Sequence, residues 1–111
     1  MKANTKSIKP VPAIAVQYVY EVRKRLGAHV REVILFGSQA RGDATDASDY
    51  DFVVIVDEKS RQLRDTVTDA GTTVLNTTDR LCASLVYGED QWHRVLSTPL
   101  GWNISREGVE L

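Results

Sequence analysis

Two kinds of hydrophobic spacing alternate along this chain, and together they predict its main elements. Continuous apolar runs occupy residues 33–36 and 52–56, and the second run is rich in β-branched side chains. Runs of this length bounded by polar residues are typical of buried strands. Residues 81–87 (LCASLVY) show the alternation of side chains that is typical of a strand and predict a third one. The chain is therefore expected to build a sheet around these segments.

Helical spacing fills the stretches between the predicted strands. A first helix begins at Pro12 and ends near Gly27, with Ile14, Tyr18 and Val22 on its apolar side. A second helix is predicted over about 60–76 and a short third helix over 89–96, which Pro99 is expected to end. A last apolar contact at 100–104 precedes a tail at 108–111.

These elements predict an α/β (α+β) fold. We expect a small mixed sheet of three to five strands with helices mainly on one face. A chain of 111 residues is one small domain with a single core, so residues 1–111 form one predicted domain, of which 1–10 are a flexible tail.

Composition removes several classes of function. The net charge of -1 implies no bulk attraction to nucleic acid or to an anionic membrane. No apolar run approaches the length of a membrane span, and the N-terminus lacks the apolar core of a signal peptide. Cys82 is the single cysteine, which excludes an intrachain disulfide and a thiolate metal cluster. A cytoplasmic location is expected.

The residues with candidate chemistry lie between the first two predicted strands. Gly37 and Ser38 end the first strand, and Asp49 and Asp51 open the second. Side chains two positions apart on a strand point to one face, with Cα atoms about 6.6 Å apart, so the two carboxylates can aim at one point. Like charges held so close repel unless a proton or a cation lies between them.

Carboxylate pairs of this kind favour Mg²⁺, with Mn²⁺ as an alternative, bound between the protein and substrate phosphates. Gly37 allows the backbone to approach a ligand closely, and the amides from Ser38 onward begin a short helix whose N-terminus attracts anions. The two features together predict a nucleoside triphosphate site. Asp49 and Asp51 are the expected metal ligands and catalytic residues, and Gly37 and Ser38 are expected to bind the nucleotide.

Two further points concern the same segment. Residues 37–42 have the glycine spacing of a P-loop, but Asp43 and Ala44 follow where Lys and Ser or Thr are required, so a P-loop is excluded. Arg41 has two interpretations that stay open. It binds the nucleotide by neutralising phosphate charge, or it forms an internal ion pair with Asp43 or Asp51.

These residues resemble a known family. Gly37-Ser38, ten residues, and then Asp49-Tyr50-Asp51 match the pattern GS-x10-D-x-D, and the longer string G-S-x-A-R-G-x5-S-D-x-D is present over 37–51. The chain thereby resembles the minimal nucleotidyltransferase (MNT) family of the DNA polymerase β-like superfamily. The resemblance implies the polymerase β-like fold and Mg²⁺-dependent transfer of a nucleoside monophosphate, AMP from ATP, to a hydroxyl acceptor. It also implies a helical HEPN toxin as partner and an antitoxin role, while self-association stays open.

The sequence departs from the family pattern at one point. Most active members carry a third carboxylate on a later strand beside the Asp-x-Asp pair, and the strand predicted at 81–87 contains no acid. Ser84 is the residue expected in the acid's place, but a hydroxyl cannot act as a base near neutral pH. The acids flanking the strand reach the site only if a loop rearranges; they are Asp79, Glu89 and Asp90.

Losing a general base typically costs about 10²–10⁴-fold in rate. Two alternatives to an efficient enzyme therefore stand beside the leading interpretation. One is a catalytically weak or inactive module that binds a nucleotide or a partner. The other is a purely structural interaction domain that binds no triphosphate.

Overall fold

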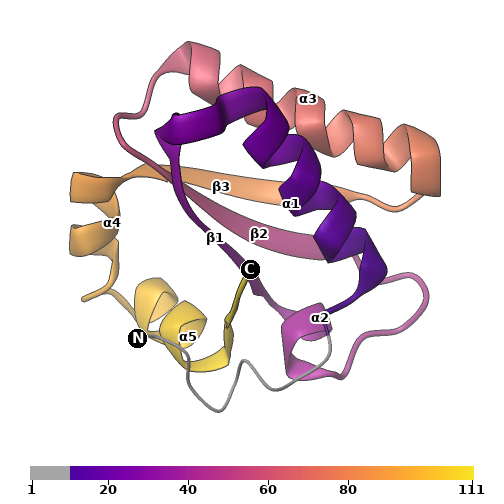
Figure 1. Ribbon diagram of the computed structural model, residues 1–111. Coiled ribbons are helices and arrows are strands. Elements are labelled where there is room, and N and C mark those ends of the chain that lie inside the picture. The colour runs from indigo at the N-terminus through magenta and orange to yellow at the C-terminus, as the bar shows by residue number, and fades with distance from the viewer. Residues whose placement is uncertain (1–10) are drawn as a thin grey trace.

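A four-stranded sheet with helices on both faces forms the domain (Figure 1). The computed structural model describes residues 11–111, so the predicted N-terminal tail lies outside the described residues. In chain order the elements are α1 (Ala13–Leu26), η2 (Gly27–His29), β1 (Val30–Phe36), α2 (Ser38–Arg41), β2 (Tyr50–Val56), α3 (Arg61–Thr78), β3 (Cys82–Gly88), α4 (Glu89–Val95), α5 (Pro99–Glu107) and β4 (Val109–Glu110).

The sheet is mixed, with strand order β3-β2-β1-β4. β2 pairs antiparallel with β1 and parallel with β3, whereas β4 pairs antiparallel with β1. A parallel neighbour requires a crossover connection, and α3 supplies it. The predicted α/β class, the mixed sheet and the three core strands are confirmed.

Each face of the sheet is covered by a different pair of helices. α1 and α3 lie side by side across one face (Figure 1) and enclose the larger core, in which the Tyr18 ring stacks on Phe52 with centroids 3.9 Å apart. On the other face, Trp92 of α4 and Ile104 of α5 pack against Val53 and Ile55. The expectation of helices mainly on one face is therefore met only in part: the two long helices share one face, whereas α4 and α5 cover part of the other.

The C-terminal region differs from the prediction. Pro99 does not end the preceding helix, because α4 already ends at Val95. Pro99 begins α5 instead, and the Thr98 side chain caps that helix by accepting a hydrogen bond from the Gly101 amide at 3.2 Å. Pro is favoured at the first position of a helix after a Thr cap, so a local signal was present. The predicted tail includes β4, which pairs with β1.

Among residues 11–111, no helix has both the length and the apolar character that crossing a bilayer demands.

Candidate active site

The turn after β1 places the backbone of Gly37 directly against the carboxylate of Asp51. In the antiparallel ladder Phe36 lies opposite Asp51, so the chain turns at the next residue. Gly37 has φ 77° and ψ -159°, a region open essentially to glycine alone. A Cβ built at this position would lie 2.5 Å from the Asp51 Oδ2 atom. Any side chain at residue 37 would therefore displace the carboxylate.

The two predicted acids lie on either side of the start of β2. Asp49 is exposed and precedes the strand, whereas Asp51 lies within it and is half-buried. Burial raises the pKa of Asp51 above its ordinary value, the negative charge of Asp49 raises it further, and the charge of Arg41 lowers it. The folded chain thus holds two carboxylates close enough to repel each other.

This arrangement fits a divalent cation. Two oxygen-donor side chains of like charge, one of them against a glycine turn, flank the start of β2, and a positive ion between them would relieve their repulsion. Within residues 11–111, no three His, Cys, Asp or Glu side chains form a group that could hold a metal ion.

The predicted anion-binding turn is the start of α2. The amides of Ala40 and Arg41 donate to the Gly37 carbonyl at 3.0 Å, which closes the first turn. The amide groups that open a helix have no partner within it, and Ser38 is at that position. Gly37 and Ser38 are both half-buried, so the turn is accessible from outside. Their role in nucleotide binding stays a prediction.

Arg41 forms two ion pairs. Its Nε atom lies 3.2 Å from Asp43 Oδ2, and its Nη1 atom lies 3.2 Å from Glu107 Oε1 at the end of α5. The predicted ion pair with Asp43 is present, and the second partner of Arg41 is Glu107 rather than Asp51. Sequence analysis missed Glu107 because the two residues are 66 positions apart and only the packing of α5 brings them together.

The expectation that Ser84 takes the place of the third acid is wrong. Ser84 faces the helices on the opposite side of the sheet, where its hydroxyl forms a hydrogen bond with the hydroxyl of Tyr18. In the parallel ladder, Ala83 is the register partner of Asp51, and it is exposed. Because neighbours in register point to the same face, Ala83 occupies the position beside the acid pair.

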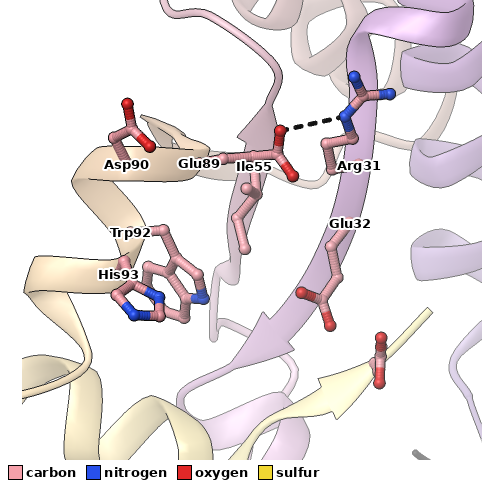
Figure 2. A pocket seen from close by; sticks show the side chains of 8 residues that line it. Arg31, Glu32, Ile55, Glu89, Asp90, Trp92 and His93 are labelled. Carbon is pink, nitrogen blue, oxygen red and sulfur yellow. Dashed lines mark hydrogen bonds and ion pairs between the residues drawn. The ribbon is translucent and has the colours of Figure 1, made fainter. Parts of the chain in front are cut away.

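A separate cavity lies away from these residues. A hollow of about 690 Å³ opens between β1, the far end of β2 and α4, and Figure 2 shows Glu89 on its rim paired with Arg31 at 3.3 Å. Carboxylates outnumber cations in its lining. The carboxylates belong to Glu32, Glu89, Asp90 and Glu110. A negative lining of this kind repels polyphosphate. None of the predicted site residues lines it.

Sequence comparison gives the family to which this fold and its pair of acids belong. The family model described as "Nucleotidyltransferase domain" matches residues 17–93. This range includes the glycine turn, both acids and all three core strands, so the chain belongs to the nucleotidyltransferase domain family. The family resemblance drawn from the GS-x10-D-x-D pattern is confirmed, and the protein is a nucleotidyltransferase.

Individual relatives agree with this assignment. The chain is 27% identical over 92 residues to "Putative protein adenylyltransferase MJ0604" of Methanocaldococcus jannaschii, a match that covers 83% of this chain and 88% of the relative. Two solved structures share the fold. One is a toxin-antitoxin with AMP-PNP, with TM-score 0.60 and 17% identity, and the other is the toxin-antitoxin MntA-HpeT, with TM-score 0.57 and 19% identity. Each match covers 84% of this chain and 68% of the chain in the solved structure.

Replacing Gly37 should damage the site more than the fold. In Gly37→Ala the new methyl group pushes the Asp51 carboxylate aside, and binding of a Mg²⁺–nucleotide measured by calorimetry should be lost. The unfavourable backbone itself should cost about 1–3 kcal/mol of unfolding free energy.

Gly27→Ala is the matched control for this substitution. Gly27 also has a positive φ, 58°, but among the described residues no atom beyond its chain neighbours lies within 4 Å of the position of its Cβ. The two variants should lose similar unfolding free energy in urea, while only Gly37→Ala loses ligand binding. Equal binding by both variants would show that Gly37 does not control the site.

Asp51 should make the ligand-free protein less stable at neutral pH. Because folding raises its pKa above the ordinary 3.8, the folded chain keeps this proton at pH values where the unfolded chain has lost it. Stability therefore falls as the pH rises through the interval between the two pKa values, and the cost stays constant above it.

We accordingly expect Asp51→Asn to melt at a higher temperature than wild type at pH 7 in EDTA. The difference should disappear below about pH 3, where both states of the wild type are protonated. Asp46→Asn, at an exposed position in the same loop, serves as control and should leave the melting temperature unchanged. A lower melting temperature for Asp51→Asn at pH 7 would contradict the repulsion.

Proposed function

We propose that this nucleotidyltransferase transfers AMP from Mg²⁺-bound ATP to a hydroxyl group of a partner protein and thereby acts as an antitoxin in the cytoplasm. The observation that carries the proposal is the contact of the Gly37 backbone with the Asp51 carboxylate beside Asp49. The name of the Methanocaldococcus relative supports adenylyl transfer to protein. The two toxin-antitoxin structures, one of them with AMP-PNP, support a partner and an adenine nucleotide. We infer a helical HEPN-type toxin as the partner.

Each site residue has a role in this reaction. Asp49 and Asp51 would hold Mg²⁺, which supplies charge neutralisation on the triphosphate when bound. The Gly37–Ser38 turn would orient the phosphates through backbone amides. Arg41 would add positive charge at the edge of the site, held there by Asp43 and Glu107.

The reaction itself is a substitution at the α-phosphorus. The acceptor hydroxyl oxygen forms a bond to that phosphorus, and the bond to the oxygen that bridges to the β-phosphate breaks. Pyrophosphate leaves with the electron pair of the broken bond. With Ala83 in register with Asp51, the hydroxyl proton passes to water, and we expect transfer to be slow.

A second candidate function is favoured by the same alanine. If no group replaces the third acid, the chain is a module that binds the nucleotide and its partner without transferring AMP. Radiolabelled ATP separates the two candidates. Label at the α-phosphate should become attached to the partner protein under the first, whereas binding of ATP without labelling, with the partner and with other acceptors, would support the second.

The labelling experiment carries its own controls. Label at the γ-phosphate should not be transferred, because that phosphate leaves in pyrophosphate. Asp49→Asn should reduce α-label transfer by at least about 10²-fold if the carboxylate holds the metal, and Asp46→Asn in the adjoining loop should retain wild-type transfer. Labelling that survives in Asp49→Asn would exclude the proposed site.

Restoring the missing acid gives a sharper prediction. Ala83→Asp would place a carboxylate on the face of the acid pair and in register with Asp51. A general base typically contributes about 10²–10⁴-fold, so transfer should increase by up to about 10²-fold in single-turnover assays.

Ser84→Asp is the matched control for this gain. It adds the same side chain one residue later, on the opposite face against Tyr18, and should destabilise the fold without raising the rate. If Ala83→Asp binds Mg²⁺–ATP as wild type does and shows no increase in rate, absence of the third acid is not what limits transfer.

A further inference from the structure

We propose that Arg80 is a positioning residue that holds Asp49 beside Asp51 by gripping the chain on both sides of Asp49. The proposal deepens the proposed function and rests on it for the role of Asp49 as a metal ligand. Arg80 lies outside the GS-x10-D-x-D segment, between the end of α3 and the start of β3.

The grip consists of two contacts. The Arg80 Nη2 atom donates a hydrogen bond of 2.7 Å to the carbonyl oxygen of Ser48, the residue before Asp49. The guanidinium carbon of Arg80 lies 5.2 Å from the ring centroid of Tyr50, the residue after Asp49. One planar cation thereby contacts both chain neighbours of the acid.

Asp49 needs such support because the sheet does not hold it. The β2 ladder begins at Tyr50, whose amide donates to the Leu81 carbonyl at 3.0 Å. Asp49 is exposed, outside the ladder, and at the end of a loop without regular structure. In the described ladders no strand pairing includes Asp49, so its position depends on the contacts made by its two chain neighbours.

The Ser48 carbonyl also connects the acids to the glycine turn. It accepts a second, longer hydrogen bond of 3.4 Å from the Gln39 side chain in α2. The same oxygen therefore links the β3 side of the site, through Arg80, to the helix that begins at the predicted phosphate-binding turn. Movement of this carbonyl would shift Asp49 relative to both neighbours.

The contacts of Arg80 suit this role. It is half-buried, and within residues 11–111 no ion pair joins its guanidinium to a carboxylate. A cationic donor strengthens a hydrogen bond to a carbonyl, and a guanidinium on an aromatic ring adds a cation–π attraction. Lysine keeps the charge but lacks the planar group that makes both contacts at once.

A purely electrostatic role for Arg80 predicts the opposite sign. A positive charge near two carboxylates weakens their attraction for a cation, so its removal alone would tighten metal binding. Positioning predicts weaker binding instead, because residues that orient metal ligands typically contribute about 10–100-fold in affinity. The direction of the change therefore separates the two roles.

The first test needs no ligand. Amide hydrogen exchange is measured by mass spectrometry on wild type, Arg80→Met and Arg64→Met, where Arg64 is an exposed arginine on α3. Exchange in peptides covering residues 43–50 should rise in Arg80→Met, with the core strands unchanged and with Arg64→Met matching wild type. Unchanged exchange in this loop would overturn the grip, whatever the protein binds.

The second test measures ligand binding. Calorimetry with Mn²⁺ and α,β-methylene ATP, which cannot release pyrophosphate, should show affinity about 10–100-fold weaker in Arg80→Met and intermediate in Arg80→Lys. In an Asp49→Asn background, Arg80→Met should cause no further loss, because Arg80 acts through Asp49. Tighter binding in Arg80→Met, wild-type binding in Arg80→Lys, or additive losses in the double variant would each overturn the proposal.

Failure of the proposed function gives a different result. If wild type does not bind Mn²⁺ and the analogue while loop exchange still rises in Arg80→Met, the grip on the loop stands and the assignment of Asp49 as a metal ligand fails.

Discussion

The approach of a bare backbone to a carboxylate is the constraint on which this site depends. Gly37 can lie against Asp51 only because it has no Cβ and accepts a positive φ. That contact places the first turn of α2, with its amide groups, next to the start of β2, where both acids lie. The antiparallel pairing of β1 with β2 fixes this contact. Phe36 is paired with Asp51, so the next residue, Gly37, is where the chain turns beside the carboxylate.

Repulsion between the acids is the cost of this arrangement. Burial and the charge of Asp49 both raise the pKa of Asp51, so the fold disfavours the charged form of this carboxyl group. A cation would reverse the sign of this term by attracting both carboxylates. Sites that bind a metal commonly carry such stored repulsion, because a pair neutralised within the protein would have less to gain from the ion.

Contacts from distant parts of the chain hold the site from outside. Glu107 of α5 fixes Arg41, and Arg80 contacts Ser48 and Tyr50. On the neighbouring strand β3, Ala83 occupies the position in register with Asp51, and its methyl side chain carries no charge and no hydrogen-bonding group. The domain thus presents two acids and an alanine at the position beside them, and this is the reason to expect slow chemistry.

Sequence alone determined the elements and the motif, because both depend on neighbours along the chain. Apolar runs and helical spacing located the three core strands and the helices α1, α3 and α4, and the spacing of Gly37, Asp49 and Asp51 named the family. Local reasoning missed α5 even though Thr98 and Pro99 signal its start, because the preceding helix was allowed to end at the same proline. Tertiary structure alone decided which residues meet across the sheet. A strand's alternation shows that Ala83 and Ser84 face opposite sides, but only packing of α1 and α3 on one side determines which of them lies beside Asp51. The same holds for Glu107 and Arg80, whose partners are set by long-range register and helix packing, and no spacing within a short segment of chain encodes those.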